Sequence, residues 1–464
     1  MLNYIWLALV LLAVAIGGLT NRLKEVTDGA FDGAKTAVTI SLGLIGIMAL
    51  WLGVMRLAER AGLIQKLARG LRPIMTRLFP DVPSDHPAMG SMLMNMAANM
   101  LGLGNAATPL GLRAMRDLES LNPHPGIASN AMCTFLAINT SSVQLIPTTA
   151  IAILVAAGSI NPTAIVGTAL LATLCAASVA ITSVKLLEKL PLFRVGKSNS
   201  PIIAAHNEHA GSGEAFSNST QNASSNQLPD SGSSTLPWWG KGLLALLVVF
   251  FLFLFIKQVF PGLLGNIGVL PFLGSVAPNE SVAGSANVFV RMVNVISILA
   301  IPFLLAFFVL YAALRGLKVY DEFVEGAKEA FDVILKIIPF LVTMLVAIGM
   351  FKGAGGIELL ARALSPVLAT LHFPVDLLPI ALMRPLSGGA TLALFTDVVH
   401  RLGPDNLVSR MAATIYGSTE TTFYVAAVYF GSVGIKQTRH AIPAGLMGDL
   451  AGVIASVVVC RMVL

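Results

Sequence analysis

The chain has 464 residues, of which 55% are hydrophobic and only 12% are charged, and its formal net charge is +6. A soluble domain carries about 25% charged residues, so this chain has too little charge to cover a surface that faces water, and lipid is the solvent that explains the deficit. The excess of Lys and Arg fits the cytoplasmic loops of a membrane protein. Because no RNA- or DNA-binding module is recognisable, nucleic acid is not expected as a partner.

The N-terminal 20 residues are apolar and lack a basic region ahead of the apolar stretch. This pattern predicts a retained signal-anchor helix rather than a cleaved signal peptide. The three cysteines, Cys133, Cys175 and Cys460, lie far apart in apolar stretches. They predict neither a disulfide framework nor a metal site, and no cofactor is expected.

Apolar runs recur along the chain and predict an all-α, polytopic transmembrane protein. Each run comes near the roughly 20 residues that are needed to cross a bilayer. Two further regions, 88–119 and 376–400, are apolar but interrupted. The predicted runs are 3–20, 37–56, 130–157, 162–187, 240–259, 288–314, 333–352, 410–433 and 442–464.

A stretch of different composition lies at 194–238. It is rich in Ser, Asn, Gly and Ala and has no apolar period, which predicts a flexible linker outside the membrane. The linker divides the chain into a first repeat at 1–193 and a second part at 239–464. In the second part an extra transmembrane helix precedes the second repeat.

The two parts resemble each other in sequence. Residues 32–35 (DGAK) match 325–328 (EGAK) at an offset of 293, and 15 of the 42 positions between 32 and 73 are identical to their counterparts without a gap. Farther along, residues 138–142 lie opposite 418–422 at an offset of about 280. Internal duplication of this kind is typical of transporter folds.

Basic residues indicate how the copies are oriented. The loop 56–77 carries six of them and its counterpart at 352–372 carries two, so the positive-inside rule places the first loop in the cytoplasm and the second outside. This favours an inverted repeat. If the region 88–119 is re-entrant, the number of membrane crossings between the two copies is odd, which agrees with inversion. If that region spans the membrane, the number is even, which does not. The residues are Arg56, Arg60, Lys66, Arg69, Arg72 and Arg77 in the first loop and Lys352 and Arg362 in the second.

Four segments place Gly, Pro or consecutive polar residues inside apolar sequence: 92–109, 139–147, 382–389 and 416–424. They predict broken or re-entrant helices. Backbone groups freed by a break are tolerated in a bilayer only beside protein or a water-filled cavity, so a break marks a candidate binding site. Hydroxyl and amide side chains suit a neutral or zwitterionic polar solute, or a dehydrated cation.

A single Ser or Thr at such a place more often joins helices. Four clusters at matching places of two repeats favour a binding site instead. The predicted solute-binding residues are Asn95, Asn99, Asn105, Thr108, Asn139, Thr140, Ser141, Ser142, Gln144, Arg384, Ser387, Ser418, Thr419, Glu420, Thr421 and Thr422.

Charged residues within the apolar segments are few. Arg384 and Glu420 lie in matching breaks of the second repeat, where they are placed to pair. Glu420 and Asp449 are predicted to bind H⁺ or Na⁺ and couple it to transport. Asp449 lies opposite roughly Thr168 of the first repeat. For Asp397 and Asp449, a structural ion pair near a helix end is an equal alternative.

The sequence contains no GxSxG, HExxH or Walker motif, so no catalytic residue is predicted and the chain is not expected to be an enzyme. Without a phosphate-binding loop, ATP is not expected to be the chain's own energy source.

The polar segments resemble a known family. The stretches NMAAN at 95–99, GLGNAATP at 102–109 and NTSSVQLIP at 139–147 look like spore maturation protein A. The stretches RPLSGG at 384–389 and GSTETTFY at 417–424 look like spore maturation protein B. That family carries the nucleoside recognition, or Gate, domain, which is similar to parts of concentrative nucleoside transporters and ferrous iron transporter B. The resemblance therefore implies a multi-pass permease or gate in the bacterial inner membrane and leaves the substrate open.

These patterns together predict a transporter or gated permease for a small polar solute, whether nucleoside-like, amino-acid-like or an ion. The solute would lie between broken helices of the two repeats, with H⁺ or Na⁺ and the lipid bilayer as further partners. A homodimer is compatible with the sequence, but no feature decides it. The alternative is a membrane scaffold or sensor in envelope or spore-type maturation, in which changes in the linker matter and changes in the polar breaks do not.

Overall fold

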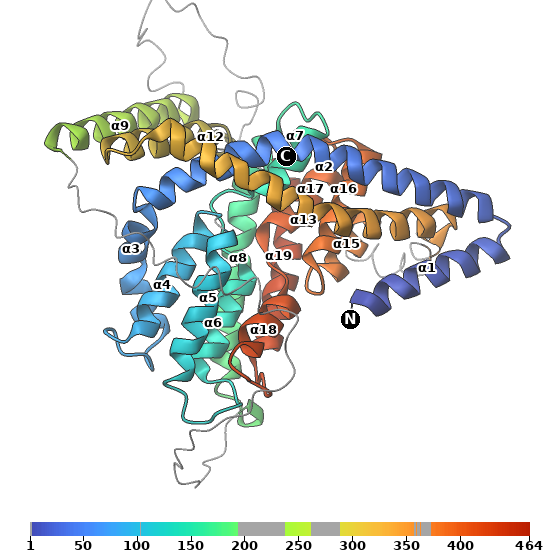
Figure 1. Ribbon diagram of the computed structural model, residues 1–464, viewed down its shortest axis with the longest axis horizontal. Coiled ribbons are helices and arrows are strands. Elements are labelled where there is room, and N and C mark those ends of the chain that lie inside the picture. Colours follow the sequence, from blue (N-terminus) through green and yellow to red (C-terminus); the bar gives the residue numbers. More distant parts are fainter. Residues whose placement is uncertain are drawn as a thin grey trace, which may run out of the picture.

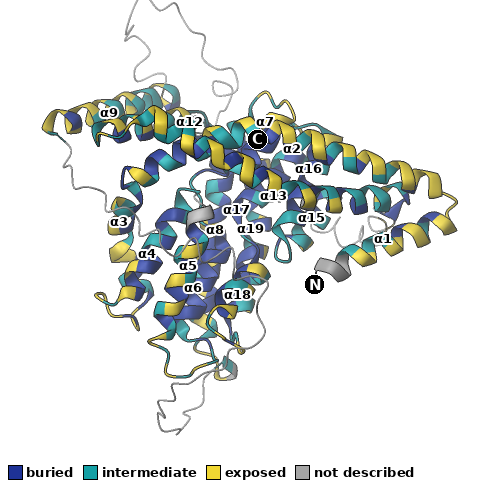
Figure 2. Ribbon diagram, viewed as in Figure 1, coloured by how far each residue is buried: buried dark blue, intermediate teal, exposed yellow. Residues whose placement is uncertain are grey.

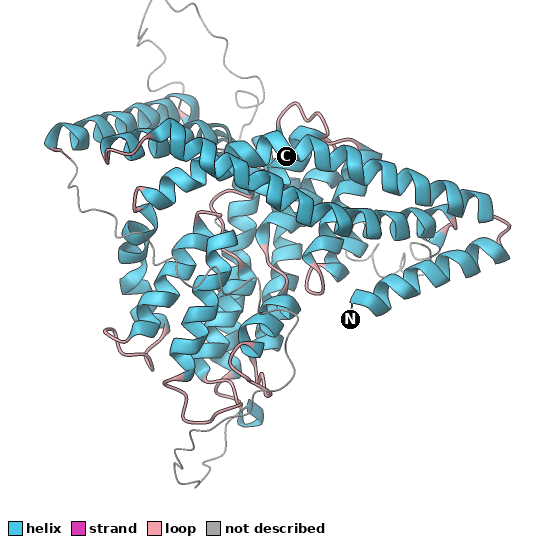
Figure 3. Cartoon of the chain, in the orientation of Figure 1, coloured by secondary structure: helices cyan, strands magenta, loops and turns pink. Residues whose placement is uncertain are grey.

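The computed structural model describes residues 2–102, 104–193, 237–260, 288–356, 359, 362 and 373–464. The regular secondary structure of these residues is helical, apart from one isolated bridge between Ile127 and Gln437, and loops and turns connect the helices (Figure 3). The predicted all-α class is confirmed. The predicted linker at 194–238 lies outside the described residues except for its last two positions.

The helices fall into two sets, one in each part of the chain (Figure 1). The first set is α1 (Leu2–Leu19), α2 (Leu23–Arg60), α3 (Leu63–Leu78), α4 (Pro87–Met100), α5 (Gly104–Glu119), α6 (Asn130–Ser141), α7 (Thr148–Ala156) and α8 (Ile165–Leu187). The second set is α9 (Trp238–Val259), α12 (Val288–Leu314), α13 (Val319–Gly353), α15 (Leu378–Met383), α16 (Gly388–Leu402), α17 (Leu407–Ser418), α18 (Thr422–Gly431) and α19 (Ala441–Val463). Short 3₁₀ turns at Pro162–Ala164, Pro191–Phe193 and Val375–Leu377 adjoin α8 and α15.

Six helices of the described chain are long and apolar enough to cross a membrane: α2, α8 with its preceding turn, α9, α12, α13 and α19. The protein is therefore a multi-pass membrane protein. Six of the nine predicted runs match these helices, and the run 3–20 corresponds to α1. The runs 130–157 and 410–433 are each divided into two helices, because the backbone leaves the helical conformation after Ser141 and after Ser418.

The helices α2 and α13, which carry the matching sequences, pack side by side and antiparallel (Figure 1). Gly29 lies against Gly349 and Gly33 lies against Leu345, so the partner's number falls as the residue number rises. A Cβ atom on Gly29 would lie only 2.2 Å from the carbonyl oxygen of Gly349. The glycines therefore allow an approach of the two backbones that a side chain would prevent.

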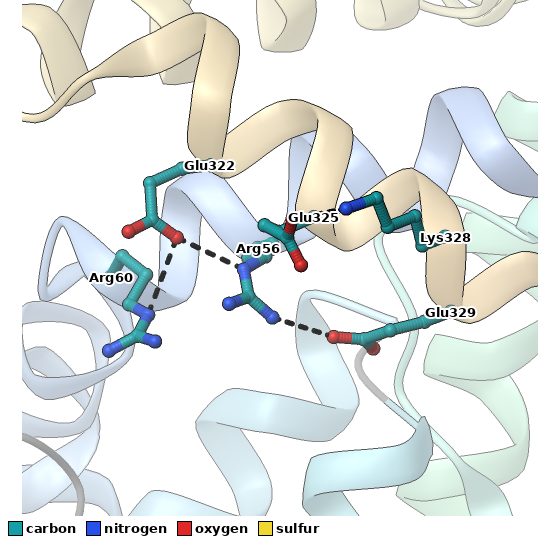
Figure 4. A network of polar contacts seen from close by, with 6 residues as sticks. All are labelled: Arg56, Arg60, Glu322, Glu325, Lys328 and Glu329. Atoms are coloured by element: carbon teal, nitrogen blue, oxygen red, sulfur yellow. Dashed lines mark hydrogen bonds and ion pairs between the residues drawn. The ribbon is translucent and has the colours of Figure 1, made fainter.

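Ion pairs join the other end of this helix pair (Figure 4). The guanidinium of Arg56 in α2 places Nε 3.0 Å from Oε2 of Glu322 and Nη1 2.8 Å from Oε1 of Glu329, both in α13. Arg60 lies 3.5 Å from the same Glu322 oxygen. Isolated exposed ion pairs contribute little to stability, but a shared network fixes the register of two helices more firmly.

A second antiparallel pair, α8 and α19, lies in the bundle beside α6 and α17. Gly448 packs against Ala180 and Gly452 against Ala176. The burial pattern shows this bundle as the most enclosed part of the molecule, whereas α9 and the outer part of α2 expose apolar side chains (Figure 2). Such exposure is expected of helices that face lipid.

A loop contact joins the two repeats away from the apolar segments. Asp405 accepts hydrogen bonds from the hydroxyl of Ser159 at 2.7 Å, the backbone N–H of Ile160 at 2.9 Å and the guanidinium of Arg410 at 3.1 Å. Partial burial raises the pKa of the Asp405 carboxyl, because it disfavours the charged form. The hydrogen-bond donors lower the pKa by more, so that it lies below its usual value.

The close contact between α2 and α13 predicts the effect of a single methyl group. Gly29→Ala should lower the stability of the protein by about 1–3 kcal/mol, because its Cβ would overlap the backbone of Gly349. Thermal unfolding of the detergent-solubilised protein measures this. Gly46→Ala is the matched control, since nothing lies within 4 Å of a Cβ there, and alanine should leave stability unchanged or raise it. Equal effects of the two substitutions would contradict the close approach.

Candidate functional site

Two helix breaks, one from each repeat, cross at the centre of the bundle. The helix α6 ends at Ser141, and Ser142 adopts a left-handed conformation with φ of 37°. The helix α17 ends at Ser418, and Thr419 is extended before α18 begins. The backbone N–H of Glu420 donates to the carbonyl oxygen of Thr140 at 2.7 Å, so the two breaks are joined through their backbones.

A third break, between α15 and α16, is held to the same place. The backbone N–H of Phe423 at the start of α18 donates to the carbonyl oxygen of Pro385 at 3.0 Å. The side chain of Ser387 caps α16 by accepting a hydrogen bond from the backbone N–H of Ala390. Breaks that lie far apart in the sequence thus satisfy one another's polar groups, as buried backbone requires.

One side chain of α8 completes the break after α6. The hydroxyl of Thr173 lies 2.9 Å from the carbonyl oxygens of both Ser141 and Ser142. These are carbonyl groups at the C-terminal end of α6, which have no partner within that helix. Thr173 therefore stabilises the point at which the chain stops being helical.

The corresponding residue of the second repeat is Asp449. Helices α8 and α19 each have 23 residues, and Thr173 and Asp449 are each the ninth residue of their helix. The sequence comparison placed Asp449 opposite roughly Thr168, which instead bonds to Thr414 at 3.0 Å. The ends of α6 and α17 make Ser141 and Ser418 equivalent, which is an offset of 277. The sequence comparison had placed this segment at an offset of about 280. Apolar stretches of the two halves can be aligned in more than one register, which explains the difference.

The Asp449 side chain is buried, with 3% of its surface exposed. Its Oδ2 accepts a hydrogen bond from the hydroxyl of Thr422 at 2.6 Å. Its Oδ1 has no hydrogen-bond partner among the described residues. A buried carboxyl oxygen without a donor is costly unless it carries a proton or contacts a cation.

Amide side chains connect the first repeat's break to its neighbours. The amide nitrogen of Asn99 in α4 donates to the Asn139 side-chain oxygen at 2.8 Å, and the Tyr429 hydroxyl lies 3.4 Å from the same oxygen. The amide nitrogen of Asn95 donates to the carbonyl oxygen of Ala107 at 2.7 Å. These bonds fix the α4–α5 hairpin against α6 and α18.

Arg384 is buried among groups of the second repeat. Its Nε donates to the Thr419 hydroxyl at 3.3 Å, and its guanidinium lies over the Tyr416 ring, 4.8 Å from the centroid. Its Nη2 lies 3.9 Å from Oε2 of Glu420. Only 3% of the Arg384 side chain is exposed, against 41% for Glu420. The carboxylate is therefore the accessible partner of this pair.

Three cavities meet at Glu420. One of about 160 Å³ lies toward Asn99 and Asn139 of the first repeat. A second of about 200 Å³ lies toward Arg384 and Tyr416. The third, of about 780 Å³, opens between the breaks and the α2–α13 pair. Glu420 lines all three cavities, so its carboxylate is the charge that they share.

The predicted site residues fall into two groups in the structure. Those that line the cavities are Asn99, Thr108, Asn139, Gln144, Arg384, Ser387, Glu420 and Thr421. Those buried elsewhere around the breaks are Asn95, Thr140, Ser141, Ser142, Ser418, Thr419, Thr422 and Asp449. The side chain of Asn105 lies outside the described residues.

Several hydroxyls of the second group bond within their own helix rather than to open space. Thr140 donates to the carbonyl oxygen of Ala137, and Ser418 donates to that of Ile415. The carboxylate of Asp397 lies 3.9 Å from the amine of Lys352. This contact favours the structural ion pair over a role in ion coupling for Asp397.

Sequence reasoning missed several cavity-lining residues. Thr148, Thr149 and Tyr416 line the second and third cavities, Tyr424 lines the first and third, and Trp51 lines the third. Both tyrosines lie within the break at 416–424, although they were not among the predicted binding residues. Thr148 and Thr149 directly follow the break at Pro147, so their position in the sequence could have indicated that they line the site. Trp51 lies in an uninterrupted apolar helix, where the sequence carries no sign of a site.

The fold and this site define the protein as an all-helical, multi-pass membrane protein built from two related halves. A family model described as nucleoside recognition (Gate) matches residues 41–158 and 334–436. The first half is similar to spore maturation protein A of Bacillus subtilis (strain 168), with 49% identity over 174 residues, which cover 38% of this chain and 89% of that protein. The second half is similar to spore maturation protein B of the same organism, with 41% identity over 169 residues, which cover 36% of this chain and 95% of that protein.

The chain therefore belongs to the spore maturation protein A and B family, with both members joined in one polypeptide. The resemblance seen in the sequence is confirmed. No solved structure matches the chain.

The role of Thr173 is testable by an isosteric change. Thr173→Val should destabilise the protein by about 1–3 kcal/mol, because the two buried carbonyl oxygens lose the one hydroxyl proton that lies within reach of both. Thr182→Val on the same helix is the control, since the exposed Thr182 hydroxyl bonds only to Ser178 of its own helix. Thermal unfolding in detergent compares the two. A Thr173→Val protein as stable as the control would show that the break does not depend on this hydroxyl.

Proposed function

We propose that this protein is a permease that moves a small polar solute across the membrane and binds it at Glu420. The observation that carries the proposal is that Glu420 lies where breaks from the two repeats cross and lines three cavities at once. An ionisable residue within the membrane-spanning part of a protein marks a solute pathway by default, because a charge at that depth is otherwise too costly to keep.

We further propose that the two repeats are inverted copies. The matching helices α2 and α13 run antiparallel, as do α8 and α19. This packing is the one that a two-fold axis between the repeats would produce, and such an axis in the membrane plane would make them inverted copies. Inverted repeats with interrupted helices place the solute between the copies and allow access from either side in turn.

The lining favours a solute with several hydrogen-bonding groups. Gln144 and Asn139 offer amides, Thr148 offers a hydroxyl and Tyr424 an aromatic ring, beside the Glu420 carboxylate. The largest of the three cavities at Glu420, about 780 Å³, falls within the range of about 300–1,000 Å³ that is usual for small-molecule sites. Nucleoside-like and amino-acid-like solutes fit this chemistry, and the two smaller cavities suit an ion.

Glu420 and Asp449 are the groups that we propose to couple transport to H⁺ or Na⁺. The unpartnered Oδ1 of Asp449 supports this role, because a bound proton or cation would satisfy it. Asp449 lines none of the three cavities, so the ion would enter in another conformation of the breaks.

We place the protein in the bacterial inner membrane, where it acts as a permease and not as an enzyme. The printed names of the relatives describe spore maturation, which leaves a second candidate function: a membrane scaffold or sensor in maturation. The two functions differ at the breaks. Under the scaffold function, Glu420→Gln and Arg384→Ala would leave maturation intact.

The permease function predicts the behaviour of a neutral substitution. Glu420→Gln should lower solute uptake into proteoliposomes at least about tenfold, because a charge-assisted hydrogen bond contributes about 1.5–3 kcal/mol. A panel of labelled nucleosides, amino acids and metal ions identifies the solute. Glu25→Gln, an exposed carboxylate at the start of α2, is the control. Absence of flux for every solute with folded protein would reject the permease.

Ion coupling predicts a separable defect at Asp449. Asp449→Asn keeps the shape of the side chain and an oxygen for the Thr422 hydroxyl, but it binds no proton or Na⁺ as a carboxylate does. Uptake down a solute gradient should persist, while an imposed pH or Na⁺ gradient should no longer accelerate it. Proteoliposomes with and without each gradient measure this. Acceleration equal to that of the unaltered protein would exclude Asp449 as the coupling group.

A further inference from the structure

The six basic residues at 56–77, at the end of α2 and on α3, do not all serve the same purpose. Arg56 and Arg60 pair with Glu322 of α13, and Lys66 lies over the ring of Tyr311, 4.6 Å from its centroid. The remaining three, Arg69, Arg72 and Arg77, lie exposed on α3 and take part in none of the ion pairs of the described chain. The structure therefore leaves a set of unneutralised guanidinium groups on one helix.

The helix α3 has two distinct faces. It has 16 residues and no acidic one. At about 100° per residue, its apolar side chains fall within an arc of about 140°, and the basic residues lie outside that arc. The apolar arc consists of Leu63, Ile64, Leu67, Ala68, Leu71, Ile74, Met75 and Leu78.

Only one side of the apolar arc is covered by protein. Ile64, Ala68 and Met75 are buried, whereas Ile74 is 54% exposed. A helix of a membrane protein with an open apolar edge and a basic opposite face lies at the boundary between acyl chains and headgroups. The guanidinium groups of α3 are then at the depth of lipid phosphates.

A cavity of about 510 Å³ lies between this helix and the start of α4. Its wall includes the apolar side chains of Ala68, Met89 and Leu93, and Arg69 and Arg72 line it as well. Asp85 also lines it and accepts a hydrogen bond from the Ser84 hydroxyl. An apolar wall beside two guanidinium groups matches an amphiphile with an anionic head.

Arg72 is held in position for such a ligand, because its Nη2 donates to the carbonyl oxygen of Ser84 at 3.2 Å. The cavity shares no lining residue with the three cavities at Glu420. It is therefore separate from the proposed solute site, and its occupant need not be transported.

We infer that this cavity binds one anionic phospholipid, with the headgroup phosphate on Arg69 and Arg72 and an acyl chain along the wall formed by Met89 and Leu93. Charge complementarity supplies the argument for this occupant. Guanidinium groups bind phosphate through paired hydrogen bonds, and basic residues at a membrane surface attract anionic lipid.

Native mass spectrometry of the full chain with added phosphatidylglycerol or phosphatidylcholine tests the inference. The unaltered protein should retain phosphatidylglycerol in preference to phosphatidylcholine, and Arg69→Gln should reduce that retention about fivefold or more. Arg77→Gln is the matched control, because it removes one positive charge from the same helix but does not line the cavity. It should retain the lipid as the unaltered protein does.

Three results would overturn the inference. Equal loss in Arg69→Gln and Arg77→Gln would indicate only a diffuse surface potential. Equal retention of the two lipids would exclude selection by charge. Stabilisation by inorganic phosphate alone, equal to that by phosphatidylglycerol in thermal unfolding, would assign the site to a free anion. Thermal unfolding without lipid also shows whether each variant is folded, and Arg69→Lys, which keeps the charge, should recover most of the retention.

Discussion

The constraint on which the rest of this structure depends is the need to satisfy backbone groups where helices are interrupted inside an apolar bundle. The end of α6 has carbonyl groups without intrahelical partners, and the chain supplies Thr173 for two of them and the N–H of Glu420 for a third. The break before α18 is satisfied by Pro385 of another break. Each interruption is stable only because a second one lies beside it. Polar side chains and cavities are consequently concentrated at one place in a chain that is otherwise poor in polar residues.

The two repeats share this architecture but differ in chemistry. Where the first repeat has the hydroxyl of Thr173, the second has the carboxyl of Asp449 at the same helical position. The first repeat contributes amides to the cavities, from Asn99, Asn139 and Gln144, and the second contributes the charges of Arg384 and Glu420. Duplication thus produced a pair of frameworks of similar geometry, and divergence placed the ionisable groups on one side only.

The sequence was sufficient to predict the helical class, most of the membrane-spanning segments and the positions of the breaks, because composition and runs of polar, Gly and Pro residues are local properties. It was not sufficient to divide the polar residues between cavity and packing. Thr140 and Ser418 looked the same as Gln144 and Thr421 in sequence, yet their hydroxyls bond to the preceding turn of their own helix. Trp51 lines the largest cavity only because α2 packs beside the breaks, and that contact depends on tertiary structure. The register expected from the sequence differs by three positions at the breaks and by five at Asp449, because short polar matches in an apolar chain align almost equally well in neighbouring registers.

The two family members that are joined in this chain share the lining of a cavity. The cavity toward Asn99 is closed on one side by Asn139 and Gln144 of the first half and on the other by Glu420 and Tyr424 of the second. Neither half alone encloses this space, and each half alone would leave a helix break with fewer partners, since Glu420 of one half donates to Thr140 of the other. The contact between the halves is therefore part of the site as well as part of the fold. A single polypeptide keeps the two halves in equal number and at high effective concentration, which favours the crossing of the breaks that both the fold and the site require.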